Sequence, residues 1–520
     1  MSILRPLVAA LALTLGAGCS SPRYEVARPV SHALERPGET FLGRTHAAQL
    51  AATPGQSGFH LLVSGQEAFL ARAAMAQAAE RTLDLQYYIV GEDATATLLL
   101  QRALRAAQRG VRVRLLIDDL YAAGRDFDLA TLAAQPNVEV RLFNPFLRRG
   151  PLGLSRLLEY LADSTRLNRR MHNKLWIADN ALAVIGGRNL GDAYFDVREE
   201  SKFADLDLLA GGPVVAAISR SFDAYWNSEW AVPIGAFLGA PPASAQLQQL
   251  LQRMDERAEK FRASDYAETL RATDLGWLLR AGGLPLAPAR ASALYDDPPK
   301  PQSGADGAES RILSVLRGAI EAAQREVILI SPYFIPSERG MGVLCGLASR
   351  RVRVRVLTNS LASTDVPVVH AGYARYRPRL LACGVQLYER RPASGAAQSV
   401  RARLSSGSSL HAKAAVVDRK WVLLGSMNLD PRSRLSNTEV AVAVESAALG
   451  AQLGELFDEA AAPDQAFRAV LADPRNERSP LAWTGEENGK PVTFTSEPLA
   501  GWWRRFVSAL LGALAPEEML

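Results

Sequence analysis

The chain has 520 residues, of which 48% are hydrophobic and 22% charged, which is ordinary for a globular protein and favours two or more domains over one. The formal net charge of +5 suits an anionic partner such as acidic lipid or nucleic acid, but on charge alone a solvated, arginine-rich surface explains it better. Three cysteines exclude a disulfide framework and lack metal-type spacing. One Cys345–Cys383 bridge is compatible with the sequence, although two small buried residues are the expectation.

The first 19 residues have the layout of a secretory signal. Arg5 precedes an apolar run from Pro6 to Ala17, which is too short for an ordinary transmembrane helix. Small residues and Cys19 end the run, as in a bacterial lipoprotein signal whose cysteine receives lipid; an ordinary signal or an uncleaved anchor is the alternative. We therefore expect a membrane-associated protein of the cell envelope with Cys19 as its lipid anchor. Residues 20–56 have little periodicity and are expected to form a linker or extended arm.

Two stretches of the chain repeat one pattern. In each, His and Lys flank a single residue, an Asp follows after four more residues, and an Asn ends a glycine-containing turn ten residues later. Every member of the second copy lies 239 residues (411 minus 172) after its counterpart. The two copies comprise His172, Lys174, Asp179 and Asn189, then His411, Lys413, Asp418 and Asn428.

Apolar strand-like runs separate the motif residues in both copies, and helical patterns alternate with further strands upstream of each. The valine- and arginine-rich runs at 111–118 and 352–359 are one such matching pair. This alternation predicts an α/β fold, and a repeat this long indicates a duplicated domain. The predicted organisation is a first domain at 57–240, a helical linker at 241–309, a second domain at 310–460 and a C-terminal segment at 461–520.

The residue types in the motif suit a phosphodiester substrate. Side chains two apart on a strand point the same way, so each copy presents an imidazole and an ammonium group side by side. The lysines and asparagines can bind phosphate oxygens as charge develops on them. One imidazole can attack phosphorus, while the other protonates the leaving oxygen and then deprotonates the incoming hydroxyl. A single His-x-Lys pair would be expected on any surface strand, whereas two matched copies indicate a reaction centre.

The complete motif resembles the HKD motif of the phospholipase D superfamily, and the resemblance extends from about residue 57 to 450. It implies two duplicated α/β/α domains with pseudo-twofold symmetry and one active site at their interface. It implies no metal and no cofactor, and the remaining histidines form no ligand-spaced cluster. The resemblance places six residues in the catalytic motif: His172, Lys174, Asp179, His411, Lys413 and Asp418.

Roles within the motif follow from the resemblance. His172 is assigned as the nucleophile and His411 as the general acid and base, while Asn189 and Asn428 join the lysines as phosphate ligands. Asp179 and Asp418 lie near strand ends and are expected to be structural hydrogen-bond acceptors. A nucleophilic imidazole needs its other nitrogen held by an acceptor, and the family supplies a carboxylate downstream of each motif. The candidates are Asp205 and Glu439, with Glu199, Glu200 and Asp207 as alternatives.

A finer resemblance, to bacterial cardiolipin synthases of the C type, rests on Gly187–Tyr194, Ser331–Pro336, Asn359–Asp365 and His370–Arg377. It implies transfer of a phosphatidyl group from a histidine to phosphatidylglycerol, with phosphatidylethanolamine favoured over a second phosphatidylglycerol as donor. Anionic phospholipids and a membrane are therefore the expected partners, nucleic acid is not expected, and the sequence identifies no helper protein. Many such synthases begin with two transmembrane helices, whereas this chain begins with the signal-like segment.

Two further segments are candidates for contact with lipid. His370, Tyr373 and Arg377 share one face of an expected helix and either line a headgroup path or form a packed, partly exposed face. Near the C-terminus, paired Trp and Arg at 502–505 precede leucines at helical spacing. That segment suits the interface of an anionic bilayer, or else a terminal helix that packs on the domain.

Three other functions compete with phosphatidyl transfer. A hydrolytic phospholipase D would use water in place of the alcohol acceptor, and the motifs do not separate the two reactions. A nucleic-acid phosphodiesterase is disfavoured by the signal segment and by the lack of basic runs with interleaved aromatic residues. An inactive lipid-binding scaffold is disfavoured because both motifs are intact.

Overall fold

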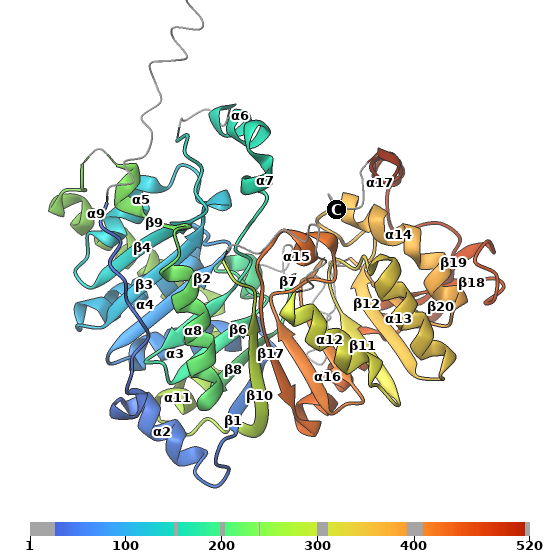
Figure 1. Cartoon of the computed structure of the whole chain (residues 1–520), viewed down its shortest axis with the longest axis horizontal. Coiled ribbons are helices and arrows are strands. Elements are labelled where there is room, and N and C mark those ends of the chain that lie inside the picture. Colours follow the sequence, from blue (N-terminus) through green and yellow to red (C-terminus); the bar gives the residue numbers. More distant parts are fainter. Residues whose placement is uncertain are drawn as a thin grey trace, which may run out of the picture.

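The computed structural model describes residues 26–149, 154–197, 203–238, 240–298, 310–392 and 409–514. The signal-like segment with Cys19 lies outside the described residues, as do Glu199 and Glu200. Two α/β domains lie side by side, the first in blue to green and the second in yellow to red (Figure 1). The predicted α/β fold with two duplicated domains is confirmed.

Within the described residues, eighteen strands form one connected sheet. Those of the first half are β1 (Ser57–Leu62), β2 (Thr82–Tyr87), β3 (Arg112–Asp118), β4 (Val138–Phe143), β5 (Leu175–Ala178), β6 (Leu182–Gly186), β8 (Asp207–Gly211) and β9 (Ala231–Pro233). Those of the second half are β10 (Ala287–Tyr295), β11 (Glu326–Ile330), β12 (Arg353–Asn359), β13 (Gln386–Arg390), β15 (Ala414–Val417), β16 (Trp421–Gly425), β17 (Val440–Glu445), β18 (Ala466–Leu471), β19 (Leu481–Glu487) and β20 (Lys490–Phe494).

The strand pairings are symmetric about the junction of the two domains. From that junction outward, the first half runs β1, β8, β6, β5, β2, β3, β4, β9. The second half runs β10, β17, β16, β15, β11, β12, β13, β18, with β19 and β20 added at its edge. In both halves three consecutive strands are parallel, β2, β3 and β4 in the first and β11, β12 and β13 in the second, and the others pair antiparallel. The duplication seen in the motifs therefore extends to the order of the strands.

Strand β10 joins the two halves. Its first residues pair with β1 and its remaining residues pair with β17. The segment 241–309 was expected to be a helical linker, and it does contain three helices on the first domain. Its last part, however, contains strand β10, which joins the sheets of the two domains into one. The Pro- and Ala-rich sequence of this strand did not indicate that role.

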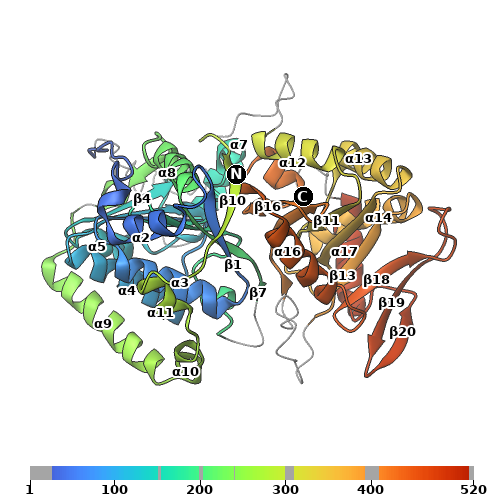
Figure 2. The same cartoon turned by 90° about the horizontal axis from the view of Figure 1, so that it is seen from below.

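Helices cover the sheet on both sides (Figures 1 and 2). The first half carries α2 (Phe41–Gln49), α3 (Gly65–Ala78), α4 (Ala94–Gln108), α5 (Asp126–Ala133), α6 (Leu154–Ala162), α7 (Ser164–Leu167), α8 (Pro213–Trp226), α9 (Ser244–Arg262), α10 (Asp265–Arg271) and α11 (Leu275–Arg280). The second half carries α12 (Arg311–Glu321), α13 (Ser337–Ser349), α14 (Pro367–Ala382), α15 (Pro431–Leu435), α16 (Ala447–Ala460) and α17 (Trp502–Leu514). Local signals set their starts: Ser64 and Glu67 form a capping box on α3, and Asp93 caps α4.

Three apolar cores stabilise this arrangement. One lies in the first domain and one in the second. The third contains residues of both, including Phe222 on α8, Phe457 on α16, Leu175 on β5 and Val416 on β15. Burial of apolar surface in this shared core favours association of the two halves, which holds the two motifs in one place.

The N-terminal arm, residues 26–36, lies along the first domain. Buried or half-buried arginines donate to its backbone carbonyls: Arg141 to Pro29, Arg114 to Ser31 and Arg112 to His32. Arg28 donates to the carbonyl of Glu229 at the arm's beginning. Part of the segment expected as a linker or extended arm is therefore fixed to the domain surface.

Two features concern the cysteines and the membrane. Cys345 on α13 and Cys383 at the end of α14 form a disulfide with a Cα–Cα distance of 5.4 Å, so the expectation of two separate buried thiols is wrong. The two cysteines are 38 residues apart in sequence, and only the fold places the two helices that carry them next to each other.

None of the helices in the described ranges is both long and apolar enough to cross a bilayer.

Candidate active site

Each motif lies in an extended segment that enters the sheet at β5 or β15, and each segment is held by the opposite domain. His172 donates its backbone N–H to the carbonyl of Thr438 at 2.9 Å, and Met171 forms a bridge with Thr438. In the equivalent contact, β14 (Ser409–Leu410) pairs with β7 (Phe203–Ala204), and the N–H of His411 donates to the carbonyl of Ala204 at 2.8 Å. Backbone pairing across the interface thus sets the position of both histidines.

The carboxylates that orient the histidines are exchanged between the halves. Nδ1 of His172 lies 3.0 Å from Oε2 of Glu439, and Nδ1 of His411 lies 2.5 Å from Oδ2 of Asp205. A carboxylate on Nδ1 fixes the proton there and leaves Nε2 with a lone pair for chemistry. Asp205 and Glu439 therefore occupy the orienting positions, each serving the histidine of the other repeat. The alternative Asp207 instead pairs with Arg72 at 2.8 Å.

The two carboxylates are supported differently. Glu439 accepts hydrogen bonds from the hydroxyls of Ser426 and Ser433, at 2.5 and 2.7 Å. Asp205 accepts from the backbone N–H of Leu206 at 2.8 Å and lies against Gly187, where a Cβ would collide with its carboxylate. Gly187 and Ser426 are the same motif position in the two repeats, so one residue leaves room for a carboxylate and the other donates to one.

Burial controls the ionisation of the histidines. Both imidazoles are almost fully buried. Burial lowers the pKa of His172 to about 4 against the opposing charge of Glu439, so this imidazole is neutral at physiological pH. Burial and the adjacent Lys413 also lower the pKa of His411, while Asp205 opposes the shift. A neutral imidazole oriented by a carboxylate has the protonation state that a nucleophile needs.

The lysines lie beside the histidines and are also buried. Nζ of Lys174 donates to the carbonyl of His172 at 2.6 Å, and Lys413 makes the same bond to His411. Burial lowers the pKa of Lys174 to about 7 and that of Lys413 to about 8, despite the attraction of Glu439 and Asp205. Two partly charged ammonium groups in a low-dielectric site attract an anionic phosphodiester strongly.

The asparagines differ in their contacts. Asn189 is engaged at both ends, because Oδ1 accepts from the N–H of Ile89 at 3.1 Å and Nδ2 donates to the hydroxyl of Tyr194 at 2.9 Å. Asn428 is buried, and its Oδ1 has no hydrogen-bond partner within the described part of the chain. Their role as phosphate ligands stays a prediction.

The motif aspartates hold the backbone. Asp179 accepts from the N–H groups of Glu80, Arg81 and Thr82 at 2.8 to 2.9 Å, at the start of β2. Asp418 accepts in the same way from residues 324–326 at the start of β11, at 2.7 to 2.9 Å. A carboxylate committed to three backbone donors has a structural function, and both aspartates adopt the left-handed conformation that the turn requires.

Two tyrosines border the histidines and were not singled out as site residues. The ring of Tyr88 meets His172 edge to face at a centroid distance of 5.1 Å, and that of Tyr194 meets His411 at 5.5 Å. Tyr194 ends the segment Gly187–Tyr194 that the finer family resemblance had marked, but neither tyrosine belongs to the HKD pattern. Their aromatic rings exclude water from one side of each imidazole.

The His370 group forms a structural network. His370, Tyr373 and Arg377 are all buried, so the expectation of a partly exposed helix face is wrong. The guanidinium of Arg377 lies 3.1 Å from Glu389 and 2.8 Å from Glu497. His370, Glu389 and Glu497 bring ligand-type atoms within 4.8 Å of one another, a grouping the sequence did not indicate. Arg377 pairs with both carboxylates there, so a protein cation already offsets part of their charge.

Comparison with known proteins agrees with this geometry. A family model described as cardiolipin synthase, phospholipase D-like domain, matches residues 73–226 and 316–461. The chain is 39% identical over 471 residues to cardiolipin synthase C of Escherichia coli (strain K12), and the matched region covers 90% of this chain and 97% of the relative. It is 24% identical over 427 residues to cardiolipin synthase A of Cronobacter sakazakii (strain ATCC BAA-894), covering 80% of this chain and 70% of the relative.

Among solved structures, phosphatidylserine synthase of Haemophilus influenzae Rd KW20 shares the fold, with a TM-score of 0.52, 13% identity and coverage of 80% of this chain and 90% of that one. Two duplicated domains with a shared pair of carboxylate-bound histidines define a phospholipase D-like enzyme. The chain belongs to the cardiolipin synthase family of these proteins.

Proposed function

We propose that the chain is a phosphatidyltransferase that makes cardiolipin from phosphatidylglycerol and a second phospholipid, phosphatidylethanolamine or phosphatidylglycerol. The observation that carries the proposal is the pair of buried histidines, each with Nδ1 on a carboxylate from the opposite repeat. The 39% identity to a cardiolipin synthase C across nearly the whole chain supports the choice of substrate class.

In the first step, Nε2 of His172 attacks phosphorus of the donor lipid, and the P–N bond forms as the bond from phosphorus to the headgroup oxygen breaks. His411 gives its proton to that leaving oxygen. Burial lowers the pKa of His411 in the empty site, but the negative phosphodiester beside it favours the protonated imidazole once substrate is bound. Lys174 and Lys413 neutralise charge on the phosphate oxygens.

In the second step, the displaced alcohol leaves and a hydroxyl of phosphatidylglycerol takes its place. His411 removes the hydroxyl proton, the oxygen attacks phosphorus, and the P–N bond to His172 breaks. Both histidines return to their starting states, and no cofactor is needed for the balance of protons or charge. Water in place of the lipid hydroxyl would give phosphatidic acid, which is the hydrolytic alternative.

The proposal extends to location. The protein belongs to the cell envelope and associates with a membrane, with a signal at residues 1–19 and lipid on Cys19. The signal-like sequence supports export. The Cys345–Cys383 disulfide supports it independently, because disulfides persist mainly in oxidising compartments.

The testing experiment is a lipid assay of the purified chain in mixed micelles. Phosphatidylglycerol is supplied alone and together with phosphatidylethanolamine, and the products are read by mass spectrometry. We expect cardiolipin, with a yield that depends on phosphatidylethanolamine if that lipid is the donor. Phosphatidic acid without cardiolipin would instead establish the hydrolytic reaction, and the His172→Ala chain serves as the blank.

A further inference from the structure

Helix α6 turns apolar side chains to solvent and charged side chains to the protein, which is the reverse of an ordinary surface helix. Leu157, Leu158 and Leu161 point to solvent, and Leu161 is 69% exposed. The charged residues Arg156 and Glu159 face the protein instead, and Glu159 is only 7% exposed. A surface helix normally turns its apolar side to the core, so this arrangement implies that something apolar covers α6 in use.

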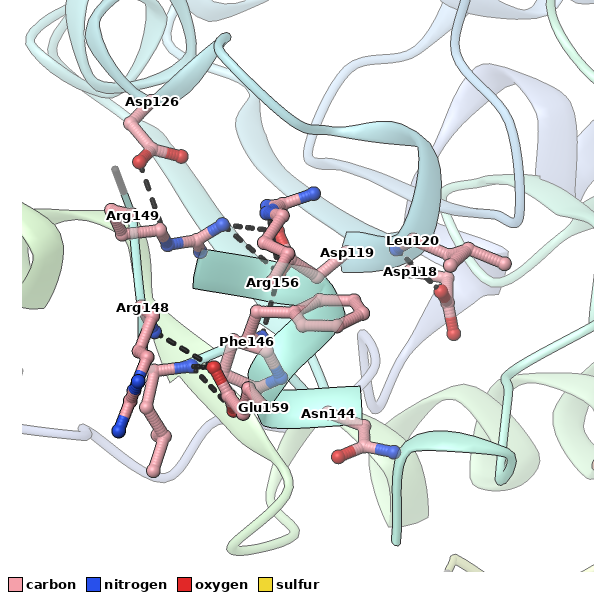
Figure 3. A network of polar contacts seen from close by, with 12 residues as sticks. Asp118, Asp119, Leu120, Asp126, Asn144, Phe146, Arg148, Arg149, Arg156 and Glu159 are labelled. Atoms are coloured by element: carbon pink, nitrogen blue, oxygen red, sulfur yellow. Dashed lines mark hydrogen bonds and ion pairs between the residues drawn. The ribbon is translucent and has the colours of Figure 1, made fainter. Parts of the chain in front are cut away.

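A polar network fixes α6 in this orientation (Figure 3). Glu159 accepts from the backbone N–H groups of Leu147 and Arg148, at 2.9 Å each. Arg156 and Arg149 both bind the buried carboxylate of Asp119, at 3.3 and 2.7 Å. These buried, paired contacts hold the polar side of α6 against the protein. The leucines on the opposite side therefore cannot turn toward the core unless these contacts break.

The base of α6 also borders the reaction centre. Asp119 begins η2 (Asp119–Tyr121), the turn that directly follows β3. The ring of Tyr121 meets Tyr88 edge to face at 5.2 Å, and Tyr88 in turn meets His172 at 5.1 Å. An aromatic path therefore leads from the exposed Tyr121 to the nucleophile.

Helix α17 is the counterpart in the second domain. Trp502, Trp503, Phe506 and Leu510 are exposed, and Trp502 is 76% exposed. The opposite side of the helix is attached to the domain through Arg504, which donates to the carbonyls of Leu361 and Thr364. The terminal helix thus combines both expected arrangements, since one side packs and the other is an exposed aromatic face.

The two helices are attached to equivalent loops. The residues that hold α17, at 360–365, follow β12 in the second repeat as η2 follows β3 in the first. Tyr333, in the second domain, donates to Asp365 of this loop at 2.8 Å. The negative charge of Asp365 favours the protonated form of Lys413 and so opposes the lowering of its pKa by burial. Both exposed apolar faces therefore stand over the edge of the same reaction centre, and α6 and α17 project from the same upper side of the molecule (Figure 1).

We propose that the exposed faces of α6 and α17 form one docking surface for a bilayer that contains anionic phospholipid. The surface presents Leu157, Leu158 and Leu161 from the first domain and Trp502, Trp503, Phe506 and Leu510 from the second. Its only carboxylate on either helix is the buried Glu159, and Arg148 lies exposed beside α6, so its charge complements an anionic surface. This deepens the proposed function, on which it rests, by stating how the site meets its lipid.

The first test locates the contact with a fluorophore. Leu161→Cys, Trp502→Cys and, as control, Trp277→Cys are each made in the full chain with Cys19→Ser, so that one free thiol takes an environment-sensitive label. Trp277 is a matched control because it is 63% exposed but lies on α11, on the lower side of the first domain. With vesicles of phosphatidylglycerol and phosphatidylethanolamine, we expect severalfold brighter, blue-shifted emission at positions 161 and 502 and no change at 277.

Two results would overturn the docking surface. One is a label at 277 that responds to vesicles while those at 161 and 502 do not, because a different face would then meet the lipid. The other is a response at 161 and 502 to protein concentration without lipid, because the faces would then bind a second copy of the chain.

The second test separates docking from chemistry. The paired change Leu157→Ser and Leu161→Ser should lower cardiolipin formation on vesicles about tenfold, whereas Trp277→Ser should leave it unchanged. Turnover of monomeric short-chain phosphatidylglycerol should be the same in all three proteins, and equal losses on both substrates would contradict docking. Labels that report lipid contact in a chain that makes no cardiolipin would refute the proposed function alone; cardiolipin formation with silent labels would refute the docking surface alone.

Discussion

The two halves have the same arrangement of strands, but the carboxylates that contact their motif histidines differ. In both, a motif aspartate ties three N–H groups at the start of a parallel strand. Around the imidazoles the copies diverge: a glutamate supported by two serine hydroxyls serves His172, and an aspartate pressed against Gly187 serves His411. The two copies therefore share the contacts that position the backbone and differ in the carboxylates that contact the histidines.

The surroundings of the two histidines also come unequally from the halves. Tyr88 and Tyr194, which contact His172 and His411, both belong to the first half. The orienting carboxylates, in contrast, are exchanged one for one. Neither half therefore supplies the whole environment of either histidine, and the environments of the two imidazoles differ.

The sharpest test of that difference is removal of each histidine. His172→Ala and His411→Ala should each lower turnover by about ten-thousandfold or more, because the nucleophile is needed for both steps and loss of the general acid and base slows both. The distinction lies in the intermediate: the His411→Ala chain should still gain the mass of one phosphatidyl group when incubated with donor lipid, and the His172→Ala chain should not. The reverse pattern by intact-protein mass spectrometry would exchange the two roles.

Removal of the carboxylate charge comes next in size. Glu439→Gln should lower turnover about a hundredfold to ten-thousandfold, because the amide can hold the wrong tautomer of His172. Asp205→Asn should act on His411 in the same way, although the two losses need not be equal. Steady-state kinetics on short-chain lipid measures both, and unchanged turnover in either would remove that carboxylate from its orienting role.

A swap at the equivalent motif position tests why the carboxylates differ. Gly187→Ser places a Cβ where it meets the carboxylate of Asp205, so we expect Asp205 to be displaced and turnover to fall about a hundredfold. Ser426→Gly removes one hydrogen bond from Glu439 while that from Ser433 remains, and about a tenfold loss is expected. Thermal unfolding of both variants serves as the control for folding, and unchanged turnover in both would mean that the two positions are interchangeable.

The smallest effect concerns pH and the lysines. Burial lowers the pKa of Lys174 to about 7 and that of Lys413 to about 8, so both are charged below that window and lose their protons as the pH rises through it. Competitive inhibition by sulfate, which keeps its charge throughout, should therefore weaken about tenfold from about pH 6 to about pH 9. An inhibition constant that stays flat over this range would show that the lysines do not bind the anion.

The sequence was sufficient for the fold class, because a fixed offset between two chemically matched segments cannot arise from local structure alone. It also picked out the motif residues that the fold brings together, while their catalytic roles stay predictions. It also pointed to Asp205 and Glu439. It did not reveal that each serves the opposite repeat, since a contact between domains leaves no spacing in the chain. The bridging strand β10 was missed because its two partner strands, β1 and β17, lie in different domains. No single periodic pattern in the sequence marks such a strand.

The His370 group illustrates a second limit. The spacing correctly put His370, Tyr373 and Arg377 on one helix face, but burial depends on what covers that face. Glu389 and Glu497, which contact Arg377 on that face, lie on β13 and near the C-terminus, far from α14 in sequence. The Cys345–Cys383 bridge was unforeseeable for the same reason.

The fixed N-terminal arm limits how far a lipid anchor could stray. Val26 is the first described residue, seven positions (26 minus 19) after Cys19, and an extended chain covers about 3.6 Å per residue, so the tether spans at most about 25 Å. If Cys19 carries lipid, as proposed, so short a tether would keep the two domains at a high effective concentration next to the bilayer. The α6 and α17 faces then need only weak intrinsic affinity, which would let the site disengage and sample new lipid without the protein leaving the membrane.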